Sequence, residues 1–310
     1  MGHQSDPGQP RLATMNDMTL PSPPLPMIVG VPRSGTTLLR LMLDAHPQLA
    51  IPPETGFLLA APHPNPQATP RELAGHLLKH PVDAPAWADF GVDAGHFLAA
   101  ASHLPQQAGL AEVLRLFYRL YAERHNKPRY GDKTPLYVEH IHRVAQHLPE
   151  ARFIHILRDG RDVALSWRKV WFAPSQDLPE LVRRWAHMIH AARQQARGLH
   201  YLEVHYDQLL RTPERQLRRI CDFIELDFNP CMLDFHRHAP ERLAEHRARY
   251  HADGHLLVSQ EQRLQQQRLT MQPLDESRLA VWRELMSPAE QTACERAAAG
   301  LLREFSDLDD

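Results

Sequence analysis

The sequence reads Pro26-Met-Ile-Val-Gly-Val-Pro-Arg-Ser-Gly-Thr-Thr37 near its beginning, and this stretch decides the fold. Its apolar start, closed by Gly30 and a proline, predicts a short buried strand. The residues from Ser34 to Ala45 carry several leucines with few polar interruptions, and they predict a buried helix. A strand, a glycine-containing turn and a helix in this order are typical of α/β folds that bind an anion at the turn.

The turn has the Gly-x4-Gly spacing of a P-loop. Glycines let successive backbone N–H groups face an anion, and the helix N-terminus adds partial positive charge. The Gly-Lys-Ser/Thr ending of a Walker loop is absent, because Gly35 is followed by Thr36 and Thr37. Arg33 supplies the charge instead, and no downstream carboxylate stands out as a magnesium ligand. The loop favours an anionic group that needs no metal, although a turn that merely caps a buried helix is the alternative.

Strands and helices alternate along the rest of the chain. Further strands are predicted to end at Lys133, Leu157 and His205, and a helical pattern follows each of them. After the first of these, Thr134 and Pro135 are an N-cap and a first-turn proline. This alternation predicts a P-loop-like central parallel β-sheet flanked by helices, with ligands at the carboxyl ends of the strands.

Length and composition indicate one enzyme-sized domain. A chain of 310 residues with 43% hydrophobic composition can bury a sizeable core. We expect residues 1–25, rich in Pro, Gly and Ser, to be a disordered lead-in without a membrane span, and residues 26–310 to form the domain. Residues 55–126 are expected to be a helical insertion that covers the acceptor side of the active site. The formal charge of −2 argues against a nucleic-acid partner.

Cysteine and histidine usage further limits the function class. The chain has three cysteines in no close-spaced motif, which argues against a disulfide framework and favours a cytoplasmic location. Its 21 histidines lack cysteine partners and helical metal-ligand spacing, so no metal site is predicted.

A second anion-binding motif lies in the run from Ile154 to Ser166. Arg158 ends the strand, and Ser166 follows eight residues later inside the next helix. This spacing lets a guanidinium and a hydroxyl approach one phosphate group. The alternative is a helix capped by Asp159 with surface arginines around it. Two anion motifs in this order on one sheet favour the binding function.

These residues carry a family resemblance. The run Pro32-Arg-Ser-Gly-Thr-Thr-Leu38 resembles the 5′-phosphosulfate-binding loop of sulfotransferases that use 3′-phosphoadenosine 5′-phosphosulfate (PAPS). The longer run to Thr55 is similar to bacterial sulfotransferases and to tyrosylprotein sulfotransferases. The Arg158 motif resembles the 3′-phosphate site of the same family. The resemblance implies that the 5′-phosphosulfate is held by Arg33, Ser34, Gly35, Thr36, Thr37 and Leu38.

The resemblance also implies catalytic roles. Glu54 matches the proposed base of tyrosylprotein sulfotransferases, and Lys133 resembles the lysine that contacts the bridging oxygen of the donor, a task that Arg33 would share. The alternatives are a solvated Glu54 and a Lys133 that pairs with Asp132. Tyr206 either lines the adenine pocket or belongs to the core.

The C-terminal part of the resemblance is less complete. Gln272-Pro-Leu274 and Trp282 resemble the segment that closes over the nucleotide in relatives. The Arg-Lys-Gly signature of the classical cytosolic enzymes is missing there.

We therefore expect a PAPS-dependent sulfotransferase that moves the sulfuryl group to an alcohol, phenol or tyrosyl hydroxyl by in-line displacement. The product nucleotide is 3′-phosphoadenosine 5′-phosphate (PAP), and no metal is required. Two alternatives remain open: a P-loop-type small-molecule kinase, which needs ATP and magnesium, and a non-catalytic adenine-nucleotide-binding module, which needs no base at Glu54. The sequence leaves open whether the acceptor is a small molecule or a peptide, and whether the protein is a homodimer.

Overall fold

The computed structural model of the chain describes residues 23–59, 65 and 67–306. Four strands form the central sheet, in the order β4 (Asp132–Lys133), β1 (Leu25–Val29), β5 (Ala151–Leu157) and β6 (Tyr201–His205). Each neighbouring pair is parallel. The predicted parallel α/β sheet is confirmed. Most of the predicted lead-in, residues 1–22, lies outside the described residues.

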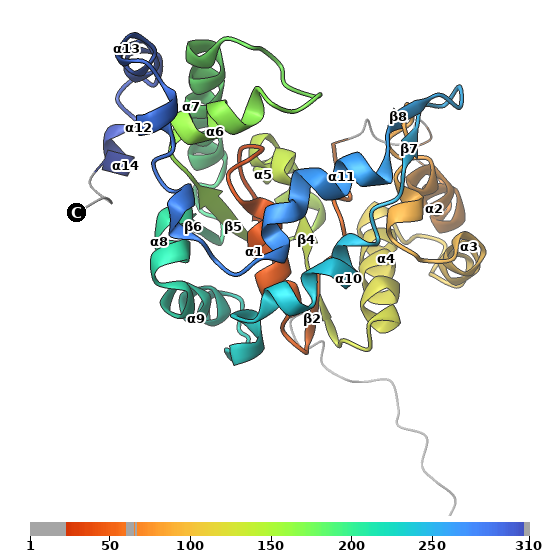
Figure 1. Cartoon of the computed structure of the whole chain (residues 1–310). Coiled ribbons are helices and arrows are strands. Elements are labelled where there is room, and N and C mark those ends of the chain that lie inside the picture. The colour runs from red at the N-terminus through yellow and green to blue at the C-terminus, as the bar shows by residue number, and fades with distance from the viewer. Residues whose placement is uncertain (1–22, 60–64, 66, 307–310) are drawn as a thin grey trace, which may run out of the picture.

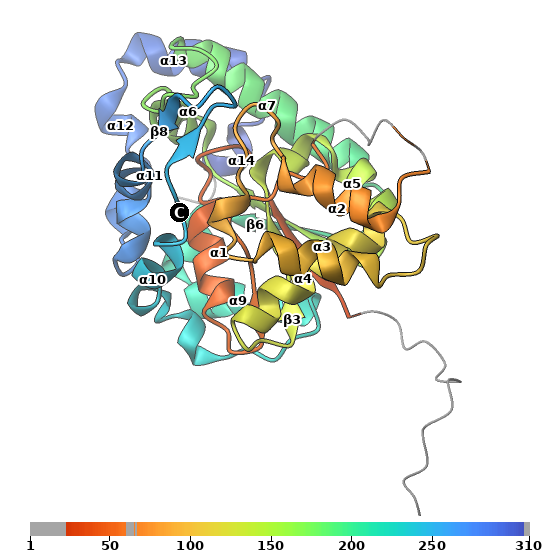
Figure 2. The ribbon, with the colours of Figure 1, turned by 90° about the vertical axis from the view of Figure 1, so that its right-hand side faces the viewer.

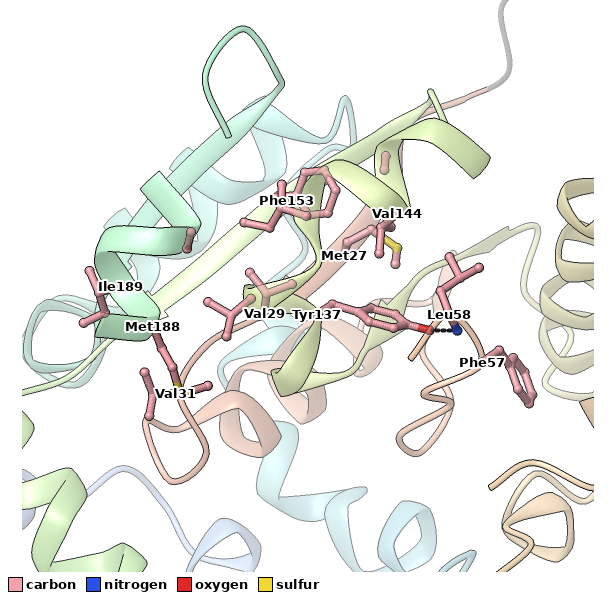
Figure 3. Packing of buried hydrophobic residues seen from close by; sticks show 14 of the residues in the cluster. Met27, Val29, Val31, Phe57, Leu58, Tyr137, Val144, Phe153, Met188 and Ile189 are labelled. Atoms are coloured by element: carbon pink, nitrogen blue, oxygen red, sulfur yellow. Dashed lines mark hydrogen bonds between the residues drawn. The ribbon is translucent and has the colours of Figure 1, made fainter. Parts of the chain in front are cut away.

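The two faces of the sheet are covered by different helices (Figures 1 and 2). Side chains alternate along β1, so Met27 and Val29 join one hydrophobic cluster and Ile28 joins the other. The first cluster also contains apolar residues of α5 (Ile141–His147) and α7 (Leu178–Gln195), and Figure 3 shows part of this packing. The second cluster contains residues of α1 (Thr36–Asp44) and of α9 (Pro213–Phe223).

The described part of the region predicted as a helical insertion, residues 55–126 without 60–64 and 66, contains three α-helices. They are α2 (Pro70–Leu78), α3 (Ala94–Ser102) and α4 (Leu110–Arg124). Figure 1 shows them together on the right of the sheet, and their apolar residues join the first cluster. Phe117 of α4 lies at the centre of an aromatic group. The distance between its ring centroid and that of Phe57 is 5.0 Å, and the distance to that of Phe90 is also 5.0 Å.

Helices begin directly after the strands that lead to the cavity described below. They are α6 (Gly160–Trp167) after β5, and α8 (Tyr206–Arg211) after β6. The helix at α8 was not predicted, because its six residues are too few for a periodic pattern. At the predicted helix start after Lys133, the structure has a 3₁₀ helix at Pro135–Glu139, and α5 begins only at Ile141.

The C-terminal part returns to α1, which contacts the 3₁₀ helices Phe235–Arg237 and Arg268–Met271, and α11 (Gln260–Gln267) passes in front of α1 in Figure 1. None of the described helices is both long and apolar enough to cross a membrane. A separate parallel pair is formed by β2 (Leu49–Ala50) and β3 (Arg129–Tyr130). The C-terminal elements are α10 (Ala239–Leu243), β7 (Arg249–Tyr250), β8 (Leu256–Val258), α11 (Gln260–Gln267), α12 (Trp282–Leu285), α13 (Pro288–Ala297) and α14 (Arg303–Ser306).

Candidate functional site

The loop between β1 and α1 is closed tightly against the neighbouring strand ends. Gly35 has a φ of 102°, a left-handed conformation that side chains rarely adopt. A Cβ atom on Gly35 would lie 2.5 Å from Cδ2 of Tyr206, so only glycine fits beside this ring. Arg33 also has a positive φ, 77°. The backbone conformation therefore turns the loop toward β5 and β6 at its second glycine.

A cavity of about 1230 Å³ lies at this end of the sheet. It brings together predicted site residues that are up to 173 positions apart in the chain, from Arg33 to Tyr206. Ser34 alone among them does not line it, because its side chain is buried beneath the loop with an Oγ that has no partner among the described residues. The predicted residues that line it are Arg33, Gly35, Thr36, Thr37, Leu38, Glu54, Lys133, Arg158, Ser166 and Tyr206.

The two predicted anion motifs touch each other across the cavity. Nε of Arg33 donates a hydrogen bond of 3.1 Å to Oγ of Ser166. Burial, and next the nearby charge of Arg158, lower the pKa of Arg33. The two guanidinium groups act on each other through their charges, and positive charge in a cavity favours binding of an anion.

Arg158 is held in place from several sides. Its guanidinium lies 4.5 Å from the centre of the Tyr206 ring, and its Nη2 donates to the carbonyl of Arg278 at 2.9 Å. Asp162, one helical turn further on, is 3.4 Å from the same nitrogen. Nε of Arg158 is buried and has no partner among the described residues. Arg158, which lines the cavity, thus keeps one unused donor.

Glu54 and Lys133 form an ion pair in the same cavity, with 2.6 Å between Nζ and Oε1. The lysine side chain is 3% exposed and the glutamate side chain 56%. Burial lowers the pKa of Lys133, although Glu54 acts against this. Desolvation raises the pKa of Glu54, but the neighbouring ammonium outweighs it and the pKa lies below its ordinary value.

The alternative pairing of Lys133 with Asp132 is not what the structure contains. Asp132 is fully buried and accepts hydrogen bonds from Thr55 at 2.6 Å and Tyr118 at 3.0 Å. Burial is the main reason that the pKa of Asp132 is raised. Because Lys133 pairs with Ile28 in the sheet, it lies beside the strand that leads into the predicted anion-binding loop.

Part of the cavity wall was not predicted from the sequence. Asp89, from the insertion, accepts from Arg263 at 2.8 and 2.7 Å, and both residues line the cavity. His246 and Arg249 line it as well. For Arg249 and Arg263 the only sequence signal was the richness of the segment after residue 236 in Arg, His and Gln, which carries no periodicity, whereas Asp89 lies in the region that was predicted to cover the site.

The predicted C-terminal closing segment is divided between two places. Gln272, Pro273 and Leu274 line the cavity, while their closure over a nucleotide stays a prediction. Trp282 instead packs outside it, with its backbone N–H donating to Asp162 at 3.0 Å and the guanidinium of Arg161 lying 3.3 Å from the ring centre.

The mouth of the cavity is partly apolar. Leu136, Trp171 and Phe172 line it and are exposed large hydrophobic side chains. Within the described ranges, no group of three or more His, Cys, Asp or Glu side chains could hold a metal ion.

Fold and cavity together define an α/β protein whose predicted anion-binding loop lacks the lysine of nucleoside-triphosphate P-loops. The family model described as the Sulfotransferase family matches residues 24–230, and the chain belongs to this family. Over 221 residues it is 29% identical to a protein-tyrosine sulfotransferase of Drosophila melanogaster, covering 68% of this chain and 40% of that one. Over 158 residues it is 32% identical to the nodulation protein NoeE of Sinorhizobium fredii, covering 49% and 33%.

Among the solved structures that share the fold are two sulfotransferase domains. The sulfotransferase domain from the curacin biosynthetic pathway has a TM-score of 0.60 and 21% identity, covering 90% of this chain and 97% of that one. The sulfotransferase domain of the Synechococcus olefin synthase has a TM-score of 0.59 and 22% identity, covering 90% and 94%. In contrast, the chain spans only 40% and 55% of the lengths of the fly and Danio rerio tyrosine sulfotransferases that it matches.

Proposed function

We propose that the protein transfers the sulfuryl group of PAPS to a hydroxyl group of an acceptor and releases PAP. The observation that carries this proposal is the arrangement of one cavity: Arg33, Arg158 and Ser166 meet at the loop, and the Glu54–Lys133 pair lies beside them. Membership of the sulfotransferase family supports the reaction class.

The donor nucleotide would occupy the cavity with its two anionic ends at the two motifs. The loop from Arg33 to Leu38 would hold the 5′-phosphosulfate with backbone N–H groups and the start of α1. Arg158, with its unused Nε, and Ser166 would bind the 3′-phosphate. Tyr206 would support the adenosine between these ends, because its ring contacts both the loop and Arg158.

The chemical step is an in-line displacement at sulfur. Glu54 takes the proton of the acceptor hydroxyl as the acceptor oxygen forms its bond to sulfur. The bond between sulfur and the bridging oxygen breaks, and its electron pair leaves with the 5′-phosphate of PAP. Lys133 and Arg33 stabilise the negative charge that develops on that oxygen. The similarity to protein-tyrosine sulfotransferases supports a phenolic or tyrosyl acceptor among the hydroxyl classes.

The test is an acceptor screen. Purified protein is incubated with PAPS and with alcohols, phenols or tyrosine-containing peptides. PAP release is measured, and mass spectrometry detects the mass that one sulfuryl group adds to the acceptor. Calorimetry with PAP, AMP and ATP–magnesium accompanies it. Tighter binding of ATP–magnesium than of PAP would support a kinase, and PAP binding without turnover of any acceptor would support a binding module.

A further inference from the structure

We propose that Thr55, Asp132 and Tyr118 are positioning residues that hold Glu54 in its working geometry relative to Lys133. This inference rests on the proposed function, in which Glu54 is the base and Lys133 contacts the donor. The three residues lie behind the cavity and do not line it.

The first observation is a second connection between the two segments that carry the ion pair. Thr55 follows Glu54 in the chain, and Asp132 precedes Lys133. Oγ1 of Thr55 donates to Oδ2 of Asp132 at 2.6 Å. The two segments are thus joined twice by adjacent residues, once inside the cavity by the ion pair and once behind it by a hydroxyl–carboxylate bond. Hydrogen bonds to a charged acceptor are shorter and stronger than neutral ones.

The connection continues along both segments. The backbone N–H of Gly56 donates to Oγ1 of Thr134 at 3.2 Å, and that of Leu58 donates to the hydroxyl of Tyr137 at 3.0 Å (Figure 3). The chain after Glu54 is therefore fixed along its length to the chain after Lys133. A shift of one segment relative to the other would break several buried hydrogen bonds together.

Burial explains why the cavity side needs this support. The side chain of Glu54 is 56% exposed, so packing around it does not fix its position. Thr55, Tyr118 and Asp132 are each at most 2% exposed, and they form a buried support behind the exposed carboxylate. The position of Glu54 is therefore set by Thr55, the next residue in the chain.

Tyr118 extends the support to the insertion. Its hydroxyl donates to the same Oδ2 of Asp132 at 3.0 Å, and its ring stacks on Tyr130 with 5.8 Å between centroids. Tyr118 belongs to α4, whereas Asp132 belongs to β4 of the central sheet. The insertion is thereby connected to the catalytic pair through one carboxylate oxygen.

Matched substitutions of Thr55 test the proposal. Thr55→Val keeps the shape and removes the donor, and Thr55→Ser keeps the donor. We expect Thr55→Val to lower kcat by about ten- to a hundredfold, as small misplacements of catalytic groups do, with PAP affinity changed by less than about threefold. Thr55→Ser should stay within about threefold of the original kcat. An unchanged kcat in Thr55→Val would overturn the proposal.

A double-mutant cycle separates positioning from general damage. If Thr55 acts through Glu54, Thr55→Val should cost less than about twofold in kcat in a Glu54→Gln background. If Glu54→Gln is itself impaired and the kcat losses of the two substitutions multiply in the double variant, the positioning role is overturned and the proposed function is not. Full turnover by Glu54→Gln would instead overturn the assignment of the base in the proposed function.

Tyr118→Phe provides a second variant in case Thr55→Val does not fold. It removes one of the two donors to Asp132 and keeps the ring in the core. We expect a smaller loss of kcat, about three- to tenfold, that also disappears in the Glu54→Gln background. A loss of kcat that persists in the Glu54→Gln background would contradict the proposal. An unchanged kcat of Tyr118→Phe in the protein that keeps Glu54 would contradict it as well.

Discussion

Nζ of Lys133 donates to Oε1 of Glu54 at 2.6 Å, so the proposed base is paired with a cation that the proposed mechanism also directs at the donor. The pairing keeps the pKa of Glu54 below its ordinary value although desolvation acts to raise it. When a PAPS oxygen takes part of the charge of Lys133, the carboxylate becomes a stronger base. Donor binding would thus prepare the base for the acceptor.

This relationship predicts the pH profile of a Lys133 variant. Lys133→Met removes the charge that lowers the pKa of Glu54 and leaves the desolvation that raises it. The acid limb of kcat/KM for the acceptor should therefore move to higher pH, measured over about pH 4 to 8 at saturating donor. Lys133→Arg keeps a charge and is the matched control. Identical acid limbs in all three forms would show that the ion pair does not govern the base.

A second prediction concerns the base itself. Glu54→Gln keeps the shape and removes the proton acceptor, so sulfuryl transfer should fall by roughly 10²–10⁴. PAP affinity, measured by calorimetry, should change by less than about threefold, because the base acts on the acceptor. Glu241→Gln, an exposed glutamate on α10, is the control and should leave both quantities unchanged. Near-full turnover by Glu54→Gln would assign the proton transfer to another residue.

Local sequence patterns were sufficient for the centre of the fold. The strand, loop and helix around Gly35 follow from apolar runs and a glycine turn, which are properties of neighbouring residues. Because parallel strands place their carboxyl ends at one edge, Lys133, Arg158 and Tyr206 could be expected to meet there. The cavity lining contains all three, while their roles stay predictions.

The remaining wall could not be predicted for a physical reason. Asp89 and Arg263 form an ion pair across 174 positions, and neither lies in a periodic apolar segment. Charged residues in polar segments carry no local signal of their partner, since any solvated charge has the same pattern. The Thr55–Asp132 hydrogen bond could not be predicted for the same reason, because a threonine and an aspartate 77 positions apart carry no local signal of each other.

The third prediction separates the two anion sites. Arg158→Ala removes the guanidinium assigned to the 3′-phosphate, and the preference for PAP over AMP should fall by about tenfold or more. Ser166→Ala should weaken it less, as a neutral donor, although it also removes the bond from Arg33. Calorimetric titration with both nucleotides gives the ratio. Arg237→Ala, on the exposed surface, is the control, and an unchanged ratio in Arg158→Ala would refute the assignment.

The fourth prediction uses the close contact at the loop. In Gly35→Ala, the new Cβ would meet the Tyr206 ring at 2.5 Å in a backbone conformation that alanine disfavours. We expect PAP affinity to fall by at least about tenfold, since the loop must open. Gly254→Ala is the matched control, because Gly254 has a φ of 88° and open space around its Cβ position. Equal effects of the two substitutions on PAP binding would show that backbone strain alone matters.

The last prediction concerns stability at acid pH. His155 lies in β5, fully buried, with Nδ1 bonded to the hydroxyl of Tyr201. Burial lowers its pKa to about 4, although Glu203 acts to raise it and Arg193 and His205 act to lower it further. In the unfolded chain the group titrates near its ordinary value of 6.5.

Between these two values the unfolded chain binds a proton that the folded protein does not, so folding is disfavoured as the pH falls. Stability should therefore decline from about pH 6.5 toward pH 4, by up to about 3 kcal/mol from this group at about 1.4 kcal/mol per unit of pKa. His155→Asn can donate to Tyr201 and does not titrate, so its urea-unfolding free energy should decline less steeply over this range. His238→Asn, at an exposed histidine, should keep the original slope. If His155→Asn and the unsubstituted protein lose stability in parallel, His155 is not the group that senses acid.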